Sequence, residues 1–229
     1  MRRTLSLLVV VCLVASRAGA IAGTLAMRPT LAKSRARSVV VALASTEEGH
    51  INETIAWLEN FVIKHNLCPF AAGVRSNTRT VVAGDENTMD LIVAEATRLR
   101  SIDPKRPATT LIVLPALTDS FEDLMELQEA AEARLHNEPT AAAIQLLAFH
   151  PAAEFETAND PADVALRSPH PIIHLLRDAD VIAAEDQWAA SHAPEAPPGI
   201  QARNAAYLRG LGFRAASEAA AEAVRMPPR

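Results

Sequence analysis

Apolar residues recur every three or four positions in several stretches of the chain, with polar residues between them. This spacing gives a helix one buried face, so it predicts amphipathic helices. Asn87 and Ser120 stand where two of these helices begin and are the expected N-terminal caps. The predicted helices cover residues 46–66, 87–103, 120–135, 183–191 and 200–211, and an alanine-rich tail, 215–229, extends the last helix or frays.

Three shorter runs, residues 79–82, 109–114 and 141–149, are rich in β-branched and apolar residues and predict strands. The second run shows no alternation of polar and apolar positions, which is typical of a strand buried on both faces. Because the strands alternate with helices, parallel pairing is expected. The predicted fold is therefore α/β: a single layered domain with a mainly parallel sheet of three or more strands, flanked by helices.

The segment after the third strand has a weaker pattern. Residues 151–166 contain scattered Pro, Asn and Asp without periodicity, which indicates a long loop. Ser168 followed by a proline is a typical helix start, so we expect a short helix beyond it. On that helix His170, His174 and Arg177 would follow one another at helical spacing and share one face.

The first 45 residues differ from the rest of the chain. A basic start, an apolar run from Leu5 to Val14 and small residues at positions 18–20 make the layout of a secretory signal peptide. The apolar run is far shorter than the roughly 20 residues that span a bilayer as a helix. Residues 23–45 are rich in Ala, Arg, Ser and Thr and hold no acidic residue, as in an organellar transit peptide.

Together these two parts resemble the bipartite presequences that direct proteins into the secondary plastids of algae. The resemblance implies a plastid location, and the alternative is a secreted protein with a flexible N-terminus. The expected organisation is a removable presequence, residues 1–45, a single α/β domain, residues 46–214, and a helical or frayed tail, residues 215–229.

Charge and cysteine content narrow the classes of function. Residues 46–229 hold 15 Lys and Arg against 27 Asp and Glu, a formal net charge of −12. Such a chain repels nucleic acid and anionic membranes, so no nucleic-acid partner and no membrane contact of the mature form are expected. Cys12 falls in the expected signal peptide, which leaves Cys68 alone and excludes an intrachain disulfide. A free thiol suits a reducing organelle better than secretion.

Cys68 and His150 are the candidate catalytic residues. A turn beginning after Pro69 would bring backbone N–H groups to the Cys68 thiol and favour a nucleophilic thiolate, whereas a buried thiol would be inert. His150 follows a strand, where α/β sheets gather their ligands, and it could act as a general base or simply hold the loop. Few residues separate Cys68 from the first strand, so a parallel sheet would place it opposite His150.

A candidate anion site lies around the predicted short helix. Two arginines flank its start, where the helix dipole attracts anions, and each guanidinium can bind phosphate or carboxylate through two hydrogen bonds. The alternative is that the serine only caps the helix and the arginines pair with acidic residues. The predicted ligand-binding residues are Arg167, Ser168, His174, Arg177, Arg203 and Asn204.

His170 and His174 are also four residues apart, a spacing at which two imidazoles can chelate a metal. A third ligand would have to come from Cys68, His150, Asp160 or Asp163. No third ligand stands at a matching spacing, so no metal site is predicted. Metal-dependent hydrolysis stays a third candidate function.

Four motifs stand in a fixed order along the chain: Asn66-Leu67-Cys68-Pro69-Phe70-Ala71, Phe149-His150-Pro151 with Phe155, Arg167-Ser168-Pro169 running into His174-Leu175-Leu176-Arg177, and Arg203-Asn204 before Leu211-Gly212. Together they resemble the family of domain of unknown function 1415, over about residues 53–212. The resemblance implies that Cys68, His150 and the residues named above at 167, 168, 174 and 177 stand at motif positions. It carries no established activity and no cofactor. Leu166 and His170 depart from the pattern, where Asn and an aromatic residue are usual.

The sequence thus predicts a soluble α/β protein that binds a small anionic metabolite between His150 and residues 167–177. Catalysis by the Cys68 thiol or the His150 imidazole would be a further step. The alternatives are a non-catalytic structural or ligand-sensing module and a metal-dependent hydrolase. No pattern predicts a cofactor or an oligomeric state.

Overall fold

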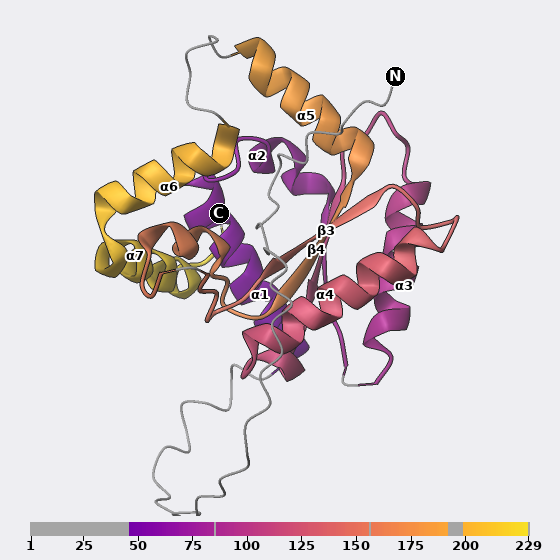
Figure 1. The fold of residues 1–229 in the computed structure, drawn as a ribbon, viewed down its shortest axis with the longest axis horizontal. Coiled ribbons are helices and arrows are strands. Elements are labelled where there is room, and N and C mark those ends of the chain that lie inside the picture. The colour runs from indigo at the N-terminus through magenta and orange to yellow at the C-terminus, as the bar shows by residue number, and fades with distance from the viewer. Residues whose placement is uncertain (1–45, 85, 156, 192–198, 229) are drawn as a thin grey trace, which may run out of the picture.

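The computed structural model describes residues 46–84, 86–155, 157–191 and 199–228, so the predicted presequence lies outside the described residues. Four strands form one sheet with helices on both of its faces (Figure 1). This arrangement confirms the predicted α/β class. The elements are α1 (Glu47–Trp57), η2 (Leu58–Ile63), α2 (Ala71–Val74), η3 (Arg75–Asn77), β1 (Thr78–Val82), α3 (Thr88–Ser101), β2 (Thr109–Val113), η4 (Pro115–Leu117), α4 (Phe121–His136), β3 (Ile144–Phe149), η5 (Pro161–Leu166), β4 (Ile172–Arg177), α5 (Asp178–Ser191), α6 (Gly199–Leu211) and α7 (Phe213–Arg225).

The strand order is β1-β2-β4-β3. β1 and β2 pair in parallel, whereas β4 lies between β2 and β3 and runs antiparallel to both. β1, β2 and β3 therefore share one direction, but the pairing is mixed, with one parallel pair, rather than mainly parallel. We call the end of the sheet where β1, β2 and β3 finish the carboxyl end, and the opposite end, where β4 finishes, the amino end.

The helix predicted after Ser168 is wrong, because residues 172–177 form strand β4. Two neighbouring strands pair with β4 along its whole length. Ile172 and Ile173 are fully buried, and β-branched side chains suit such a strand better than a short helix. His174 and Arg177 consequently belong to a strand, and no helix face joins them to His170.

The first hydrophobic core lies between the sheet and the pair α3 and α4. Ile92 and Leu99 of α3 and Leu124 of α4 are fully buried there against Ile112 of β2 and Leu175 of β4. All five residues of β2 are buried, which confirms the strand predicted to be covered on both faces. In both helices, the apolar residues that recur at helical spacing therefore face the sheet, as predicted.

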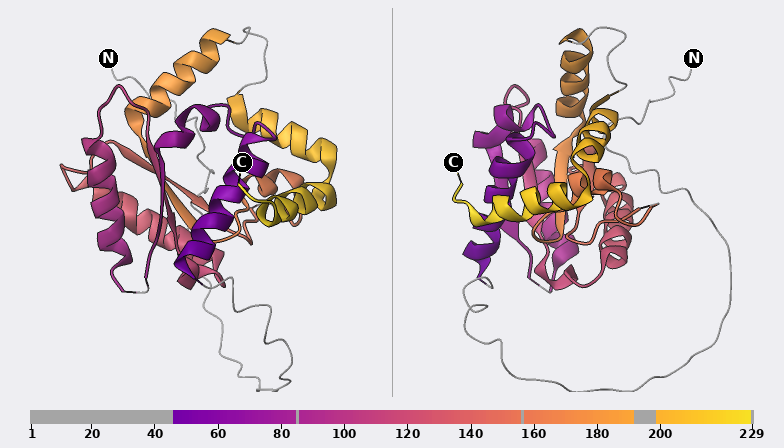
Figure 2. Two further views of the ribbon diagram at one scale, coloured as in Figure 1. Left: turned by 180° about the vertical axis from the view of Figure 1, so that it is seen from behind. Right: turned by 90° about the vertical axis from the view of Figure 1, so that its left-hand side faces the viewer.

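The second core covers the other face of the sheet. Trp57 and Phe61, from α1 and η2, pack there with Leu111 of β2, Ile172 of β4 and Leu208 of α6. Figure 2 shows the sheet edge-on, with α1 and α7 on one side and α4 on the other. No helix among the described residues is long and apolar enough to cross a bilayer.

Capping explains where two helices begin and corrects one prediction. The Thr46 hydroxyl accepts a hydrogen bond from the Gly49 N–H at 3.1 Å, and Ser120 accepts one from the Asp123 N–H at 3.0 Å, as expected of N-caps. Asn87 precedes α3 but has a φ of 76° and makes no side-chain cap bond, so its predicted role is wrong. The predicted loop 151–166 contains the short 3-10 helix η5.

The C-terminal helix α7 is held against the first helical segment. Asn60 is almost fully buried in η2, and its side-chain amide donates to the carbonyls of Ala223 and Pro227, each at 3.2 Å. Ala216 and Ala223 of α7 are buried in the second core. Small side chains let α7 approach closely, and Asn60 satisfies carbonyls that the helix end would otherwise leave unpaired.

Candidate functional site

Cys68 and His150 lie toward opposite ends of the sheet. The segment with Cys68 leads through α2 into the start of β1, at the amino end, and α2 lies beside the base of α5 (Figure 1). His150 follows the last residue of β3, at the carboxyl end. A strand of five or six residues separates these ends by roughly 17 Å, far beyond hydrogen-bond reach. The two residues therefore form no thiol–imidazole pair.

The Cys68 side chain is half-buried in a position that favours the protonated thiol. Burial raises the pKa of Cys68, and the N–H groups of Phe70 and Ala71 and the charge of Arg203 only partly oppose that effect. The turn after Pro69 does bring backbone N–H groups to the sulfur, as predicted. Their effect is smaller than the cost of burying the thiolate, so this thiol is a weak nucleophile at neutral pH.

His150 is fully buried, and both of its ring nitrogens are engaged. Nδ1 accepts a hydrogen bond from the Ala152 N–H at 3.0 Å, so Nε2 carries the proton and donates it to the Leu117 carbonyl at 3.0 Å. These bonds tie the end of β3 to η4 on one side and to the following loop on the other. The geometry matches the loop-holding alternative better than a general base.

Arg167 and Ser168 stabilise the chain at the carboxyl end. The Arg167 Nε donates to the Ala153 carbonyl at 3.0 Å, and its guanidinium lies 4.9 Å from the centre of the Phe213 ring. The Ser168 hydroxyl donates to the His170 carbonyl. Both residues thus fix the loop that leads into β4, although Ser168 caps no helix there.

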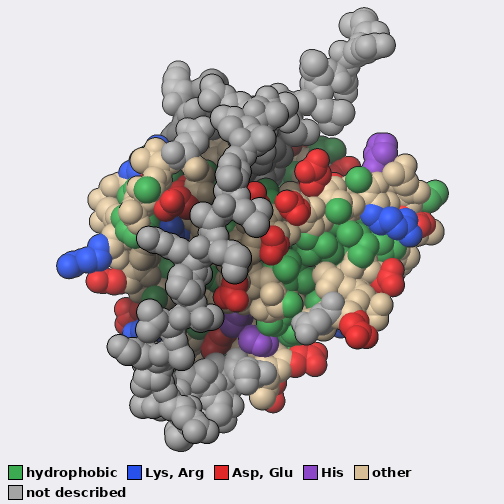
Figure 3. Space-filling view, turned by 60° about the horizontal axis from the view of Figure 1, so that its bottom comes forward, with side chains coloured by type: hydrophobic (Ala, Val, Ile, Leu, Met, Phe, Trp, Pro, Cys, Tyr) green, Lys and Arg blue, Asp and Glu red, His purple; other side chains and the backbone are tan. Residues whose placement is uncertain are grey.

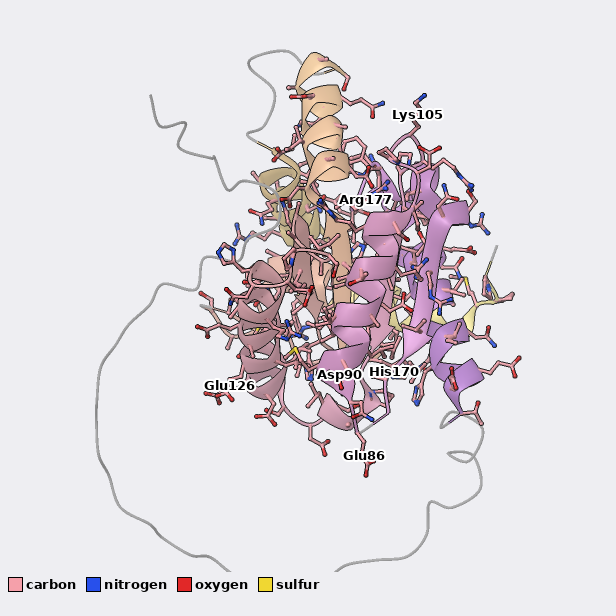
Figure 4. All side chains as sticks on the ribbon, turned by 90° about the vertical axis from the view of Figure 1, so that its right-hand side faces the viewer. Glu86, Asp90, Lys105, Glu126, His170 and Arg177 are labelled. Carbon is pink, nitrogen blue, oxygen red and sulfur yellow. The ribbon has the colours of Figure 1, made fainter. Side chains whose placement is uncertain are left out.

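Arg177 ends β4 at the amino end and is almost fully buried. Its guanidinium donates to Asp180 at 2.7 Å and to the carbonyls of Ile102 and Arg106 at 3.0 and 2.6 Å. Figure 4 shows Arg177 and His170 near opposite ends of the sheet. Arg167 lies on the His170 side, so the two arginines cannot hold one anion between them.

His174 lies in the middle of β4, where it does not reach His170. Burial lowers the pKa of His174 to about 4, so its imidazole is neutral at pH 7. Thr109 donates its hydroxyl proton to the Leu175 carbonyl and accepts a hydrogen bond from the His174 Nε2. The other proposed metal ligands are also engaged: Asp160 pairs with Arg209 and Asp163 accepts from the Phe155 N–H.

Arg203 and Asn204 meet the Asn66–Ala71 motif at the amino end. The Arg203 guanidinium donates to the Asn66 carbonyl and to the Asn204 side-chain oxygen, the latter at 2.9 Å. Asn204 in turn donates to the Leu67 carbonyl at 2.7 Å. The first and last motifs of the sequence are therefore in direct contact.

A cavity of about 480 Å³ opens beside this contact. The Arg203 guanidinium lies on its wall, 5.2 Å from the centre of the Trp188 ring of α5. Burial lowers the pKa of Arg203, but a guanidinium remains charged at any physiological pH. The described residues place no carboxylate within ion-pair distance of it. The lining residues are Asn66, Pro69, Phe70, Gln187, Trp188, Ser191 and Arg203.

Sequence reasoning missed one cluster, formed by His50, Glu53 and His170. The Nε2 of His170 lies 2.6 Å from a Glu53 carboxylate oxygen and 3.3 Å from the Nδ1 of His50. Burial lowers the pKa of His170, and the nearby Glu53 carboxylate opposes that effect. The spacing of His50 and Glu53 on one helix was visible in the sequence. The sequence did not show that His170, in the loop that leads into β4, lies beside these two residues.

Comparison with known proteins identifies a family but no activity. No curated protein and no solved structure shows a significant match to the chain. One family model, described as a protein of unknown function, DUF1415, matches residues 49–218. The match extends from α1 into α7 and so includes the whole sheet and all the motif residues. The chain belongs to the DUF1415 family.

Proposed function

We propose that the protein binds a small anionic ligand in the cavity between residues 66–70, α5 and α6. The observation that carries the proposal is the Arg203 guanidinium, which lines this cavity without a carboxylate partner among the described residues. A ligand carboxylate or phosphate would supply that partner. The ligand therefore occupies the amino end of the sheet, and not the region between His150 and residues 167–177.

The cavity has the size and lining of a small-molecule site. Its volume of about 480 Å³ falls within the range of roughly 300–1,000 Å³ that such sites occupy. Phe70 and Trp188 give it aromatic surface, while Asn66 and Gln187 add polar groups. An anion that also carries a flat or apolar part matches this combination best.

Arg203 is held in place before any ligand arrives. Its hydrogen bonds to Asn66 and Asn204 and its position against Trp188 restrict the guanidinium. A cation restricted in this way loses little side-chain entropy when an anion binds, which favours affinity. Binding, not thiol chemistry, is proposed because Cys68 has a raised pKa and no imidazole partner among the described residues.

Thermal-shift measurements with the full-length protein test this proposal. The panel contains inorganic phosphate, citrate, an aromatic carboxylate and a nucleoside monophosphate. A ligand present at 100 times its dissociation constant stabilises the folded state by about 2.7 kcal/mol, which raises the melting temperature of a domain of this size by about 5 to 10 °C. At least one member of the panel is expected to give such a shift.

Two substitutions show whether Arg203 is responsible. Arg203→Gln should abolish the shift, and Arg203→Lys, which keeps the charge but loses the planar fork, should retain a part of it. Arg214→Gln changes a largely exposed arginine on α7 and should respond like the unmodified protein. An equal shift with Arg203→Gln, or no shift with any anion, would show the proposal to be wrong.

A further inference from the structure

We propose that His50, Glu53 and His170 bind one divalent transition-metal ion of the zinc type. The cluster lies at the carboxyl end of the sheet, away from the cavity lined by Arg203, and the proposal does not depend on anion binding. His50 and Glu53 are three residues apart on α1 and so share one face of the helix. His170 comes from the loop that leads into β4.

The spacing of the three ligand atoms suits a metal ion. His50, Glu53 and His170 each offer one ligand atom, and these three atoms lie within 4.8 Å of one another. Zinc binds nitrogen and oxygen at about 2.0–2.1 Å, which places neighbouring ligands of a tetrahedral site about 3.3 Å apart. The two imidazole nitrogens already lie 3.3 Å apart. The carboxylate oxygen, at 2.6 Å from His170, needs to retreat by less than about 1 Å.

A single hydrogen bond cannot engage all three atoms of this cluster equally. If the His170 Nε2 carries a proton, it donates that proton to Glu53. The His50 Nδ1, 3.3 Å from the His170 Nε2, can then accept only a share of the same hydrogen bond. If Nε2 carries no proton, its lone pair faces a carboxylate oxygen at 2.6 Å. A metal ion between the three atoms accepts a lone pair from each of them.

The surrounding chain holds the ligands in position. The Ser168 hydroxyl donates to the His170 carbonyl, and the next carbonyl, that of Pro171, accepts from the Leu114 N–H at 2.8 Å. On α1, the Thr54 hydroxyl donates to the His50 carbonyl at 2.8 Å. These bonds restrain the backbone of both segments, so less conformational freedom is lost when an ion binds.

The ligand types select the class of metal. Two imidazoles and one carboxylate suit zinc and ferrous iron, whereas magnesium and calcium prefer oxygen ligands alone. All three residues are partly exposed, so a fourth position is open to water. In Figure 3 the lower end of Figure 1 is turned toward the viewer. Acidic side chains are spread over the visible surface, whereas Lys and Arg lie mainly toward its margins. Negative charge of this kind attracts a cation.

Metal titration of the full-length protein tests the proposal. The protein is treated with a chelator, dialysed and titrated with Zn²⁺ by calorimetry and with Co²⁺ by absorption spectroscopy. One equivalent of Zn²⁺ is expected to bind with a dissociation constant below about 10 µM. The Co²⁺ adduct should show the intense visible bands of a four-coordinate site, a readout that does not depend on any activity.

Substitutions locate the bound ion. His50→Gln, Glu53→Gln and His170→Gln should each weaken Zn²⁺ binding by about 100-fold or more, because each removes a ligand. His136→Gln, on an exposed part of α4, is the matched control and should leave the affinity unchanged. Circular dichroism checks that each variant is folded, and the three ligand positions give independent results if one of them is not. No stoichiometric binding, or binding that the three substitutions leave intact, would overturn the proposal.

Discussion

Arg177 tests whether the end of the Arg167–Arg177 motif stabilises the fold or binds a ligand. The sequence predicted an anion ligand at this position, whereas the structure gives it a buried role at the junction of β4, α5 and the loop after α3. Arg177→Met keeps an unbranched apolar stem and removes only the guanidinium. The substitution therefore separates the loss of hydrogen bonds from the loss of packing.

The expected cost follows from the bonds that disappear. Three of them are short, to Asp180, Ile102 and Arg106, and a fourth, to Asp103, is longer at 3.4 Å. Hydrogen bonds to charged groups contribute about 1.5–3 kcal/mol each, and breaking a buried ion pair costs about 3–5 kcal/mol. Residues 103–106 are exposed, so water can replace the donor for some of the carbonyls. The free energy of unfolding should therefore fall by about 3–4 kcal/mol.

Urea unfolding followed by tryptophan fluorescence measures this change, because Trp57 is buried in the second core and reports its exposure. The melting temperature should fall by about 6 to 16 °C. Arg214→Met, at a position whose side chain is 92% exposed, should alter the free energy by no more than about 0.5 kcal/mol. A loss below about 1 kcal/mol for Arg177→Met would refute the structural role. It would return Arg177 to the list of ligand candidates.

Two further predictions concern the buried histidines. The pKa of His174 is about 4 in the folded protein and near 6.5 when unfolded, so the unfolded chain binds a proton first and stability should fall as the pH drops from 6.5 toward 4. The loss should be about 2 kcal/mol, since partial exposure reduces the full effect, and urea midpoints at pH 7 and 4.5 should differ less for His174→Gln. His150→Leu leaves the Leu117 carbonyl and the Ala152 N–H without their side-chain partner and should lower the free energy of unfolding by about 2–4 kcal/mol. An unchanged midpoint with normal metal and anion binding would contradict the loop-holding role of His150.

The longer helices before α7 and three of the four strands could be predicted from the sequence, because local spacing determines them. The period of 3.6 in α3 and α4 and the continuous apolar run in β2 need no knowledge of distant partners. β4 could not be predicted in this way. Ser168 and a proline are a strong local helix start, and only pairing with β2 on one side and β3 on the other makes residues 172–177 a strand.

Which of the predicted site residues the fold brings together could not be predicted for the same reason. The separation of Cys68 and His150 is the exception, because few residues lie between Cys68 and the first strand, and strands of one direction place the two residues toward opposite ends of the sheet. Arg167 and Arg177 are close in sequence, yet an extended strand between them carries them to opposite ends of the sheet. His50 and His170 are 120 residues apart, and only the tertiary fold brings them together.

The contact between Asn60 and α7 also has a consequence for protein synthesis. The Asn60 amide and the Ala223 carbonyl are 163 residues apart in the chain. At about 5–20 residues per second, a ribosome needs roughly 10 to 30 seconds to make the intervening segment. α3, α4 and the sheet face that they cover can assemble earlier, but the α7 residues that pack with Trp57 and Phe61 are made last. The nascent chain therefore exposes a large apolar surface for many seconds, and chaperones have that interval in which to bind it.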